Sequence, residues 1–203
     1  MKAPNGKPTN LNERQWLQVR TKAFINWFGD WINDPANASK VVDENGEPLV
    51  VYHGGKYKKG EKFSVFDVSK SENRFWVSTV IGNKSFFTNN DYLAYKMSKP
   101  DYYQREVENL EGSVYEVFLN LKNPLVINAE GRRADFFIEE HKQELKDNEE
   151  IIVNNIDEDG INVTDYVVSN PNQIKSATDN NGEFSTEDDN IYHGLITGVN
   201  NED

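Results

Sequence analysis

Three tryptophans on one side of a single segment constrain the fold of this chain most. Apolar side chains between residues 11 and 34 recur at steps of three and four, which places them on one face of a helix. They are Trp16, Val19, Ala23, Phe24, Trp27, Phe28 and Trp31. We therefore predict an N-terminal helix of about five turns, with its tryptophans buried against the body of a domain. A face that binds a partner is the alternative.

The remaining segments are mostly short strand patterns. Residues 114–121 alternate between apolar and polar side chains, which is the clearest strand signal in the chain. An Asn-Gly pair at 45–46, flanked by β-branched residues, predicts a hairpin over residues 40–55. Further strands are expected at 63–67, 75–78, 85–88, 124–127, 151–153, 164–168 and 173–177, with a turn at 157–160, and helices at 92–98 and 134–148. The pattern predicts an α+β fold, in which an N-terminal helix precedes a mostly antiparallel sheet.

The 203 residues suit one domain with short appendages. We divide the chain into a linker at 1–10, the Trp-rich helix at 11–34, the main domain at 35–178 and an acidic polar tail at 179–203. The chain has no cysteine, which excludes disulfides, thiolate zinc sites and a cysteine nucleophile. The histidines His53, His141 and His193 lack the spacing of metal ligands, so we expect no metal.

Negative charge gathers in the second half of the chain. The net charge is −12; residues 130–165 carry twelve acidic and four basic residues, and residues 179–203 carry seven acidic and no basic ones. Such a surface repels phosphate backbones, so general nucleic-acid binding is not expected. A solvated acidic face with a disordered tail explains the charge most simply. No stretch resembles a signal peptide or a membrane span, so we expect a cytoplasmic protein that binds no membrane.

Two positions carry candidate chemistry. His53 ends a strand pattern and is followed by two glycines, which allow a ligand to approach the backbone closely. A structural histidine is the alternative interpretation. Asp165 opens the strand pattern Thr-Asp-Tyr-Val-Val, where a carboxylate either caps a turn or takes part in catalysis.

Four aromatic residues cluster in a segment that passes from strand to helix. They are Phe86, Phe87, Tyr92 and Tyr95. Such rings either belong to the core or form a wall on which a flat ligand ring stacks.

In their order along the chain, these motifs resemble the ADP-ribosyltransferase fold of the diphtheria-toxin and poly(ADP-ribose) polymerase type, built on a His, Tyr, Glu triad. Tyr52-His53-Gly54 resembles the motif of the first strand, and residues 85–95 resemble its aromatic strand and following helix. Residues 165–174 resemble the strand that begins with the catalytic Glu, which is Asp165 here.

The chain is similar, more specifically, to the ADP-ribosyltransferase-like domain of polyvalent proteins from phages and mobile elements. That domain has segments like residues 20–31, 50–54, 86–88, 115–119 and 165–177 of this chain, so the resemblance covers about residues 11–190. It implies a split antiparallel sheet over residues 35–178 and a bacterial, effector-like role.

The resemblance also implies residue roles. NAD would be the substrate, without a metal. His53, Asp165 and Tyr95 would be catalytic, with His53 on the adenosine ribose and the Gly54 backbone on the nicotinamide amide. The nicotinamide would stack between Phe86 or Phe87 and a tyrosine, Tyr95 or Tyr92. Gln173 would complete the NAD site.

The expected function is therefore mono-ADP-ribosylation of a macromolecular target, most simply a protein, with release of nicotinamide. Cleaving the nicotinamide–ribose bond passes through an oxocarbenium-like state that a carboxylate near the ribose stabilises. The alternatives are an NAD glycohydrolase, a catalytically weak protein that binds NAD or a protein partner, and a structural module of a larger protein.

Overall fold

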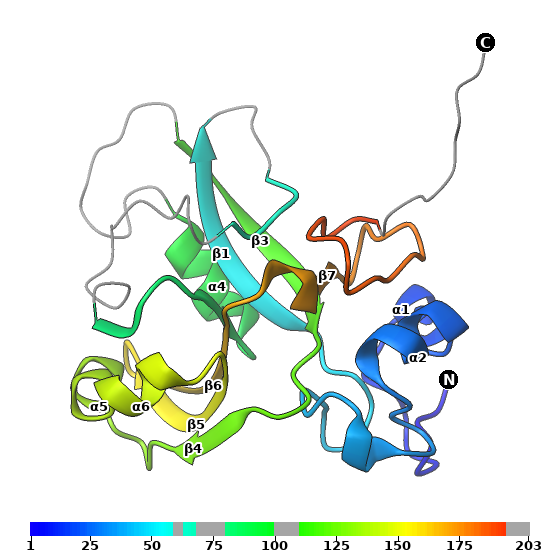
Figure 1. Cartoon of the computed structure of the whole chain (residues 1–203), viewed down its shortest axis with the longest axis horizontal. Coiled ribbons are helices and arrows are strands. Elements are labelled where there is room, and N and C mark those ends of the chain that lie inside the picture. Colours follow the sequence, from blue (N-terminus) through cyan, green and yellow to red (C-terminus); the bar gives the residue numbers. More distant parts are fainter. Residues whose placement is uncertain (59–62, 68–79, 100–109, 194–203) are drawn as a thin grey trace.

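The structure is a computed structural model that describes residues 1–58, 63–67, 80–99 and 110–193. Its centre is a seven-stranded sheet in the order β4-β5-β6-β2-β1-β3-β7 (Figure 1). Neighbouring strands are antiparallel except β4 and β5, which are parallel. The strands are β1 Val51–Lys58, β2 Ser85–Thr88, β3 Leu110–Leu119, β4 Leu125–Asn128, β5 Glu150–Glu158, β6 Ile161–Val168 and β7 Ile174–Ser176. The predicted α+β class with a mostly antiparallel sheet is confirmed; the strand predicted at 75–78 lies outside the described residues.

The helices are short and lie around the sheet. They are α1 Glu13–Gln18, α2 Lys22–Phe28, α4 Asp91–Ser98, α5 Ala134–Glu140 and α6 Lys142–Asp147, with 3-10 turns η1 Pro35–Asn37 and η3 Pro171–Gln173. Within the described ranges, no helix is both long and apolar enough to cross a membrane.

The sheet separates between β1 and β2. β1 pairs with β3 at eight positions, from Val51 opposite Val117 to Lys58 opposite Leu110, but in the described residues it pairs with β2 at one position, Tyr52 opposite Thr88. β2 continues along β6 instead, over all four of its residues. Figure 1 shows the long β1–β3 pair rising at a steep angle from β4 and β5. His53 is therefore the first residue of β1 beyond its backbone pairing with β2.

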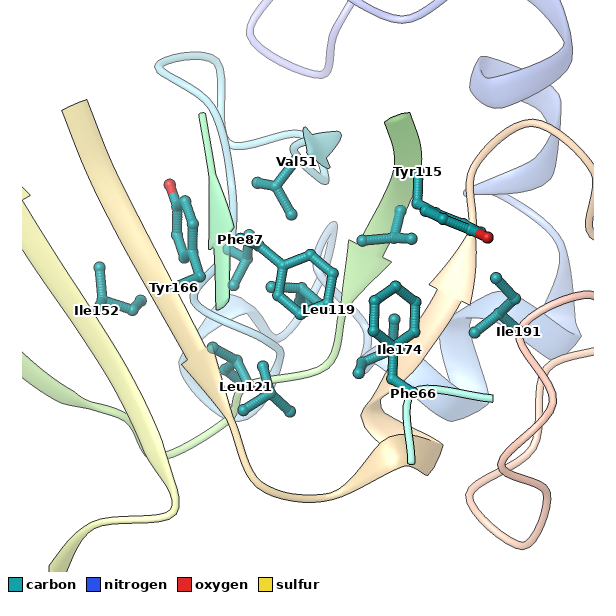
Figure 2. Packing of buried hydrophobic residues seen from close by; sticks show 13 residues of the cluster. Val51, Phe66, Phe87, Tyr115, Leu119, Leu121, Ile152, Tyr166, Ile174 and Ile191 are labelled. Carbon is teal, nitrogen blue, oxygen red and sulfur yellow. The ribbon is translucent and has the colours of Figure 1, made fainter. Parts of the chain in front are cut away.

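Alternating side chains build a core on each face of the sheet. We call the first the His53 face: its cluster includes Val51, Phe66, Phe87, Tyr115 and Tyr166 (Figure 2). The second, the α4 face, joins Leu93 of α4 and Phe137 of α5 to the strand residues Val153, Val163 and Val167. Neighbouring residues of β2 and β6 thus belong to different cores, as a period of two requires.

The single N-terminal helix that we predicted is wrong, because the chain forms two helices. α1 ends at Gln18, and Thr21 begins α2 by accepting a hydrogen bond from the Phe24 N–H at 3.2 Å. α2 ends at Gly29, whose φ of 101° favours glycine. The tryptophans still bury their faces: Trp27 and Trp31 are 2% and 4% exposed, in a core with Phe24, Phe28 and Phe118 of β3.

We expected residues 1–10 to be a linker, but they form a turn. Residues 41–50 form a second turn of the same kind. Both segments contain Asn-Gly-x-Pro, and in each the glycine N–H donates to the carbonyl three residues earlier, at 2.9 and 3.0 Å. The two turns touch, with Asn5 Nδ2 donating to Asn45 Oδ1 at 3.0 Å. The second turn replaces the hairpin predicted at 40–55: it holds a single bridge, Val42 to Pro48, and regular pairing begins at Val51.

A buried ion pair joins this N-terminal region to the second turn. Arg20 Nη2 donates to Glu47 Oε1 at 2.8 Å, and Glu47 is fully buried. The Thr9 hydroxyl donates to the other oxygen of Glu47 at 2.5 Å. The Arg20 guanidinium lies 3.9 Å above the Trp16 ring and 5.1 Å from the Trp31 ring. The polar groups satisfy one another, which a buried charge requires.

The C-terminal strap, residues 188–193, packs against the edge strand β7. The buried Lys175 ammonium donates to three strap carbonyls at 2.7–3.3 Å. The Ser176 N–H donates to the Ile191 carbonyl, and the Ile191 N–H donates to the Ser64 carbonyl, both at 2.8 Å. Residues 188–193 are thus packed, although we expected a polar tail from 179 onward.

The predicted helix at 134–148 is also divided. α5 ends and α6 begins at His141, where φ is −104° and ψ is 13°. Phe137 and Leu145 remain buried on the α4 face, so the amphipathic pattern is satisfied by two shorter helices.

Two glycines allow helix α4 to lie directly on the sheet. A Cβ at Gly54 would be 2.1 Å from the Ala94 carbonyl oxygen, and one at Gly112 would be 2.0 Å from the Ser98 carbonyl oxygen. Both contacts are with backbone, which cannot swing aside as a side chain can. Any other residue at either position therefore displaces the helix.

We predict that Gly54→Ala lowers the free energy of unfolding by about 3 kcal/mol or more, because overpacking against fixed backbone is costly. Chemical denaturation with urea measures the change. Gly55→Ala is the matched control, since a Cβ there meets only the side chains of Tyr115 and Phe63, at 3.1 and 3.2 Å. Equal losses for both variants would contradict the argument.

Candidate functional site

His53 lies on β1 among aromatic rings. The centroid of its ring is 5.1 Å from that of Phe66, 5.5 Å from that of Phe87 and 6.4 Å from that of Tyr115. Its Nδ1 is 2.6 Å from the Phe86 carbonyl oxygen. A carbonyl only accepts hydrogen bonds, so Nδ1 carries the proton and donates it. The side chain therefore links β1 to β2 just where their backbones stop pairing.

The surroundings of His53 keep its ring neutral. Burial lowers the pKa of His53, and the hydrogen bond to the Phe86 carbonyl opposes this effect. With Nδ1 protonated and the ring neutral, Nε2 keeps its lone pair. His53 is thus fixed in orientation and offers an acceptor for a hydroxyl or N–H of a ligand.

Asp165 lies on β6, opposite Thr88 of β2 and Val153 of β5. Thr88 is in turn opposite Tyr52 of β1. Tyr52, Thr88 and Asp165 therefore form one row across three strands, on the α4 face. His53, the neighbour of Tyr52, belongs to the other face. The structure brings both predicted residues to adjacent parts of the sheet but directs them to opposite faces.

Asp165 has a carboxyl partner that the sequence analysis missed. Glu158, the last residue of β5, is on the same face, and its side chain is hydrogen-bonded to Asp165. Two carboxyl groups form such a bond only when one holds a proton. Burial raises the pKa of Glu158 to about 7. Burial and the charge of Glu158 raise the pKa of Asp165 well above its usual range, so the pair retains a proton at neutral pH.

The β5–β6 hairpin places Glu158. Asp159 and Gly160 have φ of 55° and 80°, which are the values of a two-residue hairpin turn. This turn was predicted from the sequence. Lys96 of α4 lies 3.6 Å from Asp159 and so connects the hairpin tip to the helix. Alternate residues counted from the Asp159-Gly160 turn along β5 and β6 place Glu158 and Asp165 on the same face, and this count could have found Glu158 in the sequence.

The four aromatic candidates separate into two pairs. Phe87 is 2% exposed and belongs to the core of the His53 face, while Phe86 is partly buried on the α4 face and holds His53 through its carbonyl. Tyr92 and Tyr95 are 60% and 49% exposed on α4. Of these residues, Phe86 is the one in hydrogen-bond contact with His53.

Gln173 and Gly54 have structural contacts. The Gln173 amide donates to the Asn120 carbonyl at 2.9 Å and to Glu150 Oε1 at 2.6 Å, which ties η3 to β5. Gly54 lies under α4. Across the described ranges of the chain, no three His, Asp or Glu side chains gather as metal ligands do.

His53 is the third residue of β1 and Asp165 lies inside β6, so the strand end predicted at His53 and the strand start predicted at Asp165 are wrong. The split, mostly antiparallel sheet is consistent with the ADP-ribosyltransferase fold that the sequence motifs resemble. A family model confirms this class. The model described as ADP-ribosyltransferase in polyvalent proteins matches residues 43–184, and the chain belongs to that family. ADP-ribosyl transfer is the activity that the family suggests.

No curated protein and no solved structure matches the chain. The family match begins after the Arg20 region and includes the second turn, His53, Asp165 and Glu158.

The Glu158–Asp165 pair predicts how stability depends on pH. Because both pKa values are higher in the folded state, the folded protein holds protons that the unfolded chain releases. The stability that this pair contributes is complete below about pH 4 and is lost as the pH rises toward about 7.

We expect Glu158→Gln to remove much of this loss. The difference in unfolding free energy between the variant and the wild type should therefore grow in favour of the variant from pH 4.5 to pH 7. Urea denaturation across that range measures it. Glu139→Gln, an exposed carboxylate on α5, is the control, and the same slope for both variants would exclude the paired proton.

Proposed function

We propose that this protein is a mono-ADP-ribosyltransferase that transfers ADP-ribose from NAD to a protein target and releases nicotinamide. The observation that carries the proposal is the position of His53, fixed in one tautomer where β1 and β2 separate. The family match supports NAD as the substrate. The target, the cytoplasmic location in a bacterial host and the link to phages or mobile elements are part of the same proposal.

The residues suit NAD in their chemistry. The unprotonated Nε2 of His53 can accept a hydrogen bond from a ribose hydroxyl. Phe86, whose carbonyl holds His53, offers a partly buried ring on the α4 face for the nicotinamide, and Gly54, which follows His53, offers backbone groups for the amide. Tyr95 or Tyr92 as the second stacking ring, and Gln173 as a further contact, stay predictions.

Asp165 acts in this proposal as the carboxylate that stabilises positive charge on the ribose. The bond between C1′ and the nicotinamide nitrogen breaks, and its electron pair leaves with nicotinamide. A nucleophile of the target then bonds to C1′ and gives up its proton. Only an ionised Asp165 carboxylate stabilises this positive charge, so the proton that Asp165 shares with Glu158 must dissociate before the bond breaks.

The two-sided placement favours a second candidate. His53 and Asp165 are on opposite faces, and the Glu158–Asp165 pair keeps a proton at neutral pH. Both features suit a domain that binds NAD and turns it over slowly. An NAD glycohydrolase, with water as the acceptor, would use the same residues.

Nicotinamide release from NAD tests the proposed site. We expect His53→Ala and Asp165→Asn each to lower the rate by about 100-fold, as loss of one stabilising group does in other enzymes. Asp147→Asn, an exposed carboxylate on α6, is the matched control and should retain the wild-type rate. Calorimetry with NAD separates lost binding from lost turnover. If the wild type binds NAD without releasing nicotinamide, the second candidate is established. If it neither binds NAD nor releases nicotinamide, the NAD site is refuted.

The pH profile of the same reaction tests the role of the proton. In the wild type, the rate should rise as the pH increases, because Asp165, whose pKa is raised by burial and by the charge of Glu158, ionises only as the pair loses its protons. Glu158→Gln removes the negative neighbour of Asp165, so the pKa of Asp165 falls and the rise moves to lower pH. A lower rate with an unchanged profile would mean that Glu158 supports only the structure.

A further inference from the structure

A hollow of about 450 Å³ lies beside α4, on the side that faces β3. The strands supply Tyr52, Val114 and Glu116, and the helix supplies Asp91, Tyr92 and Tyr95. Tyr52 is opposite Glu116 in the β1–β3 ladder, so their side chains share one face. The site proposed above uses neither Glu116 nor Asp91, and it takes only one of Tyr92 and Tyr95 as a stacking ring.

The hollow is negatively charged. Among the residues that the structure describes, its lining includes two carboxylates and no basic side chain. Burial raises the pKa of Tyr52, and the charges of Glu116 and Asp91 raise it further, because both carboxylates line the same hollow as the phenol. The net charge of −12 adds long-range attraction for cations. A phosphate or another carboxylate would be repelled here.

The walls are aromatic. Tyr92 and Tyr95 expose 60% and 49% of their surface, although they belong to a helix whose other side is packed. Aromatic faces attract cations, and one ring already does so: the Lys99 Nζ lies 4.0 Å above the centroid of Tyr95. Three phenol rings and two carboxylates suit a flat cation that both stacks and pairs with oxygen.

A guanidinium group meets these requirements better than an ammonium group does. It is planar, stacks on aromatic rings, pairs with carboxylates through two N–H groups and is more weakly hydrated. Arg20 shows this use within the same chain, since its guanidinium lies above Trp16 and pairs with Glu47.

The hollow is placed to act together with the transfer site. Its floor residue Tyr52 and the carboxylate Asp165 belong to the same row, with only Thr88 between them. Strands are about 4.8 Å apart, so the two backbones are roughly 10 Å apart. A protein segment held at the hollow would therefore lie alongside the site of transfer.

We propose that this hollow binds an arginine side chain of the target protein and thereby selects targets with an arginine near the modified residue. The inference rests on the proposed transferase function and specifies its substrate class. The bound arginine is a docking contact, and the residue that accepts ADP-ribose is a separate one.

Binding without NAD tests this inference independently of catalysis. The full chain, labelled with 3-fluorotyrosine, is titrated with N-acetyl-arginine amide and followed by fluorine NMR. The citrulline and lysine amides serve as comparisons, since citrulline has the same shape without charge. We expect the arginine compound to shift the Tyr92 and Tyr95 signals and to bind at least about 10-fold more tightly than citrulline, and more tightly than lysine.

Two variants locate the binding. Tyr92→Ala and Glu116→Gln should each weaken arginine binding by about 3-fold to 10-fold. Phe136→Ala should not, although Phe136 is an equally exposed aromatic residue, with Arg133 5.1 Å from its ring. Circular dichroism shows that each variant is folded.

Three results would overturn the inference: equal binding of arginine and citrulline, tighter binding of lysine, or unchanged binding in both variants. A shift of the tyrosine signals by NAD in place of arginine would also overturn it and assign the rings to nicotinamide. Failure of the transferase proposal is seen separately, as absence of nicotinamide release and NAD binding.

Discussion

The contact between helix α4 and two glycines is the constraint on which the site depends. With Gly54 and Gly112 beneath it, α4 lies on β1 and β3 at backbone distance. That position fixes Tyr92 and Tyr95 above Tyr52, and it brings Lys96 to the tip of the β5–β6 hairpin that carries Glu158. The glycine after His53 thus has a packing role, whatever its role toward a ligand. Loss of catalysis in a Gly54 variant alone would not show that its backbone binds nicotinamide.

The separation of β1 from β2 explains why His53 and Asp165 have different surroundings. Beyond Tyr52 the β1 backbone has no partner in β2, and the His53 side chain supplies the next link through the Phe86 carbonyl. On the other face, β2 and β6 stay paired, and Asp165 lies within a regular ladder. One predicted catalytic residue therefore lies where the β1–β2 pairing ends and the other within continuous sheet. A ligand that reaches both would meet a fixed neutral acceptor on one side and a protonated acid pair on the other.

Much of the fold could be predicted from the sequence because side-chain periods survive tertiary packing. Residues 114–121, the Asp159-Gly160 turn and the strand that carries Asp165 all follow from alternation and turn chemistry. The prediction of one N-terminal helix was wrong because the apolar spacing continues across residues 19–21, where α1 has ended and Thr21 caps the start of α2. The repeated turn at 1–10 was missed because Asn-Gly-x-Pro also suits a linker; its contacts with the second turn, such as Asn5 with Asn45 and Thr9 with Glu47, distinguish the two. No local motif marks Glu158, because its role comes from its pairing with Asp165 on the neighbouring strand.

The C-terminal strap has a consequence for how this sheet meets other chains. Open strand edges recruit further strands, and proteins protect them with charge, short length or cover. At β7 the Ser176 N–H is taken by Ile191, and the buried Lys175 fastens the strap by three carbonyls. The opposite edge strand, β4, has only four residues, and Val126 is exposed there. In the part of the chain that the structure describes, the sheet therefore has one covered edge and one uncovered edge, so association through strand edges would stop after two copies joined through β4.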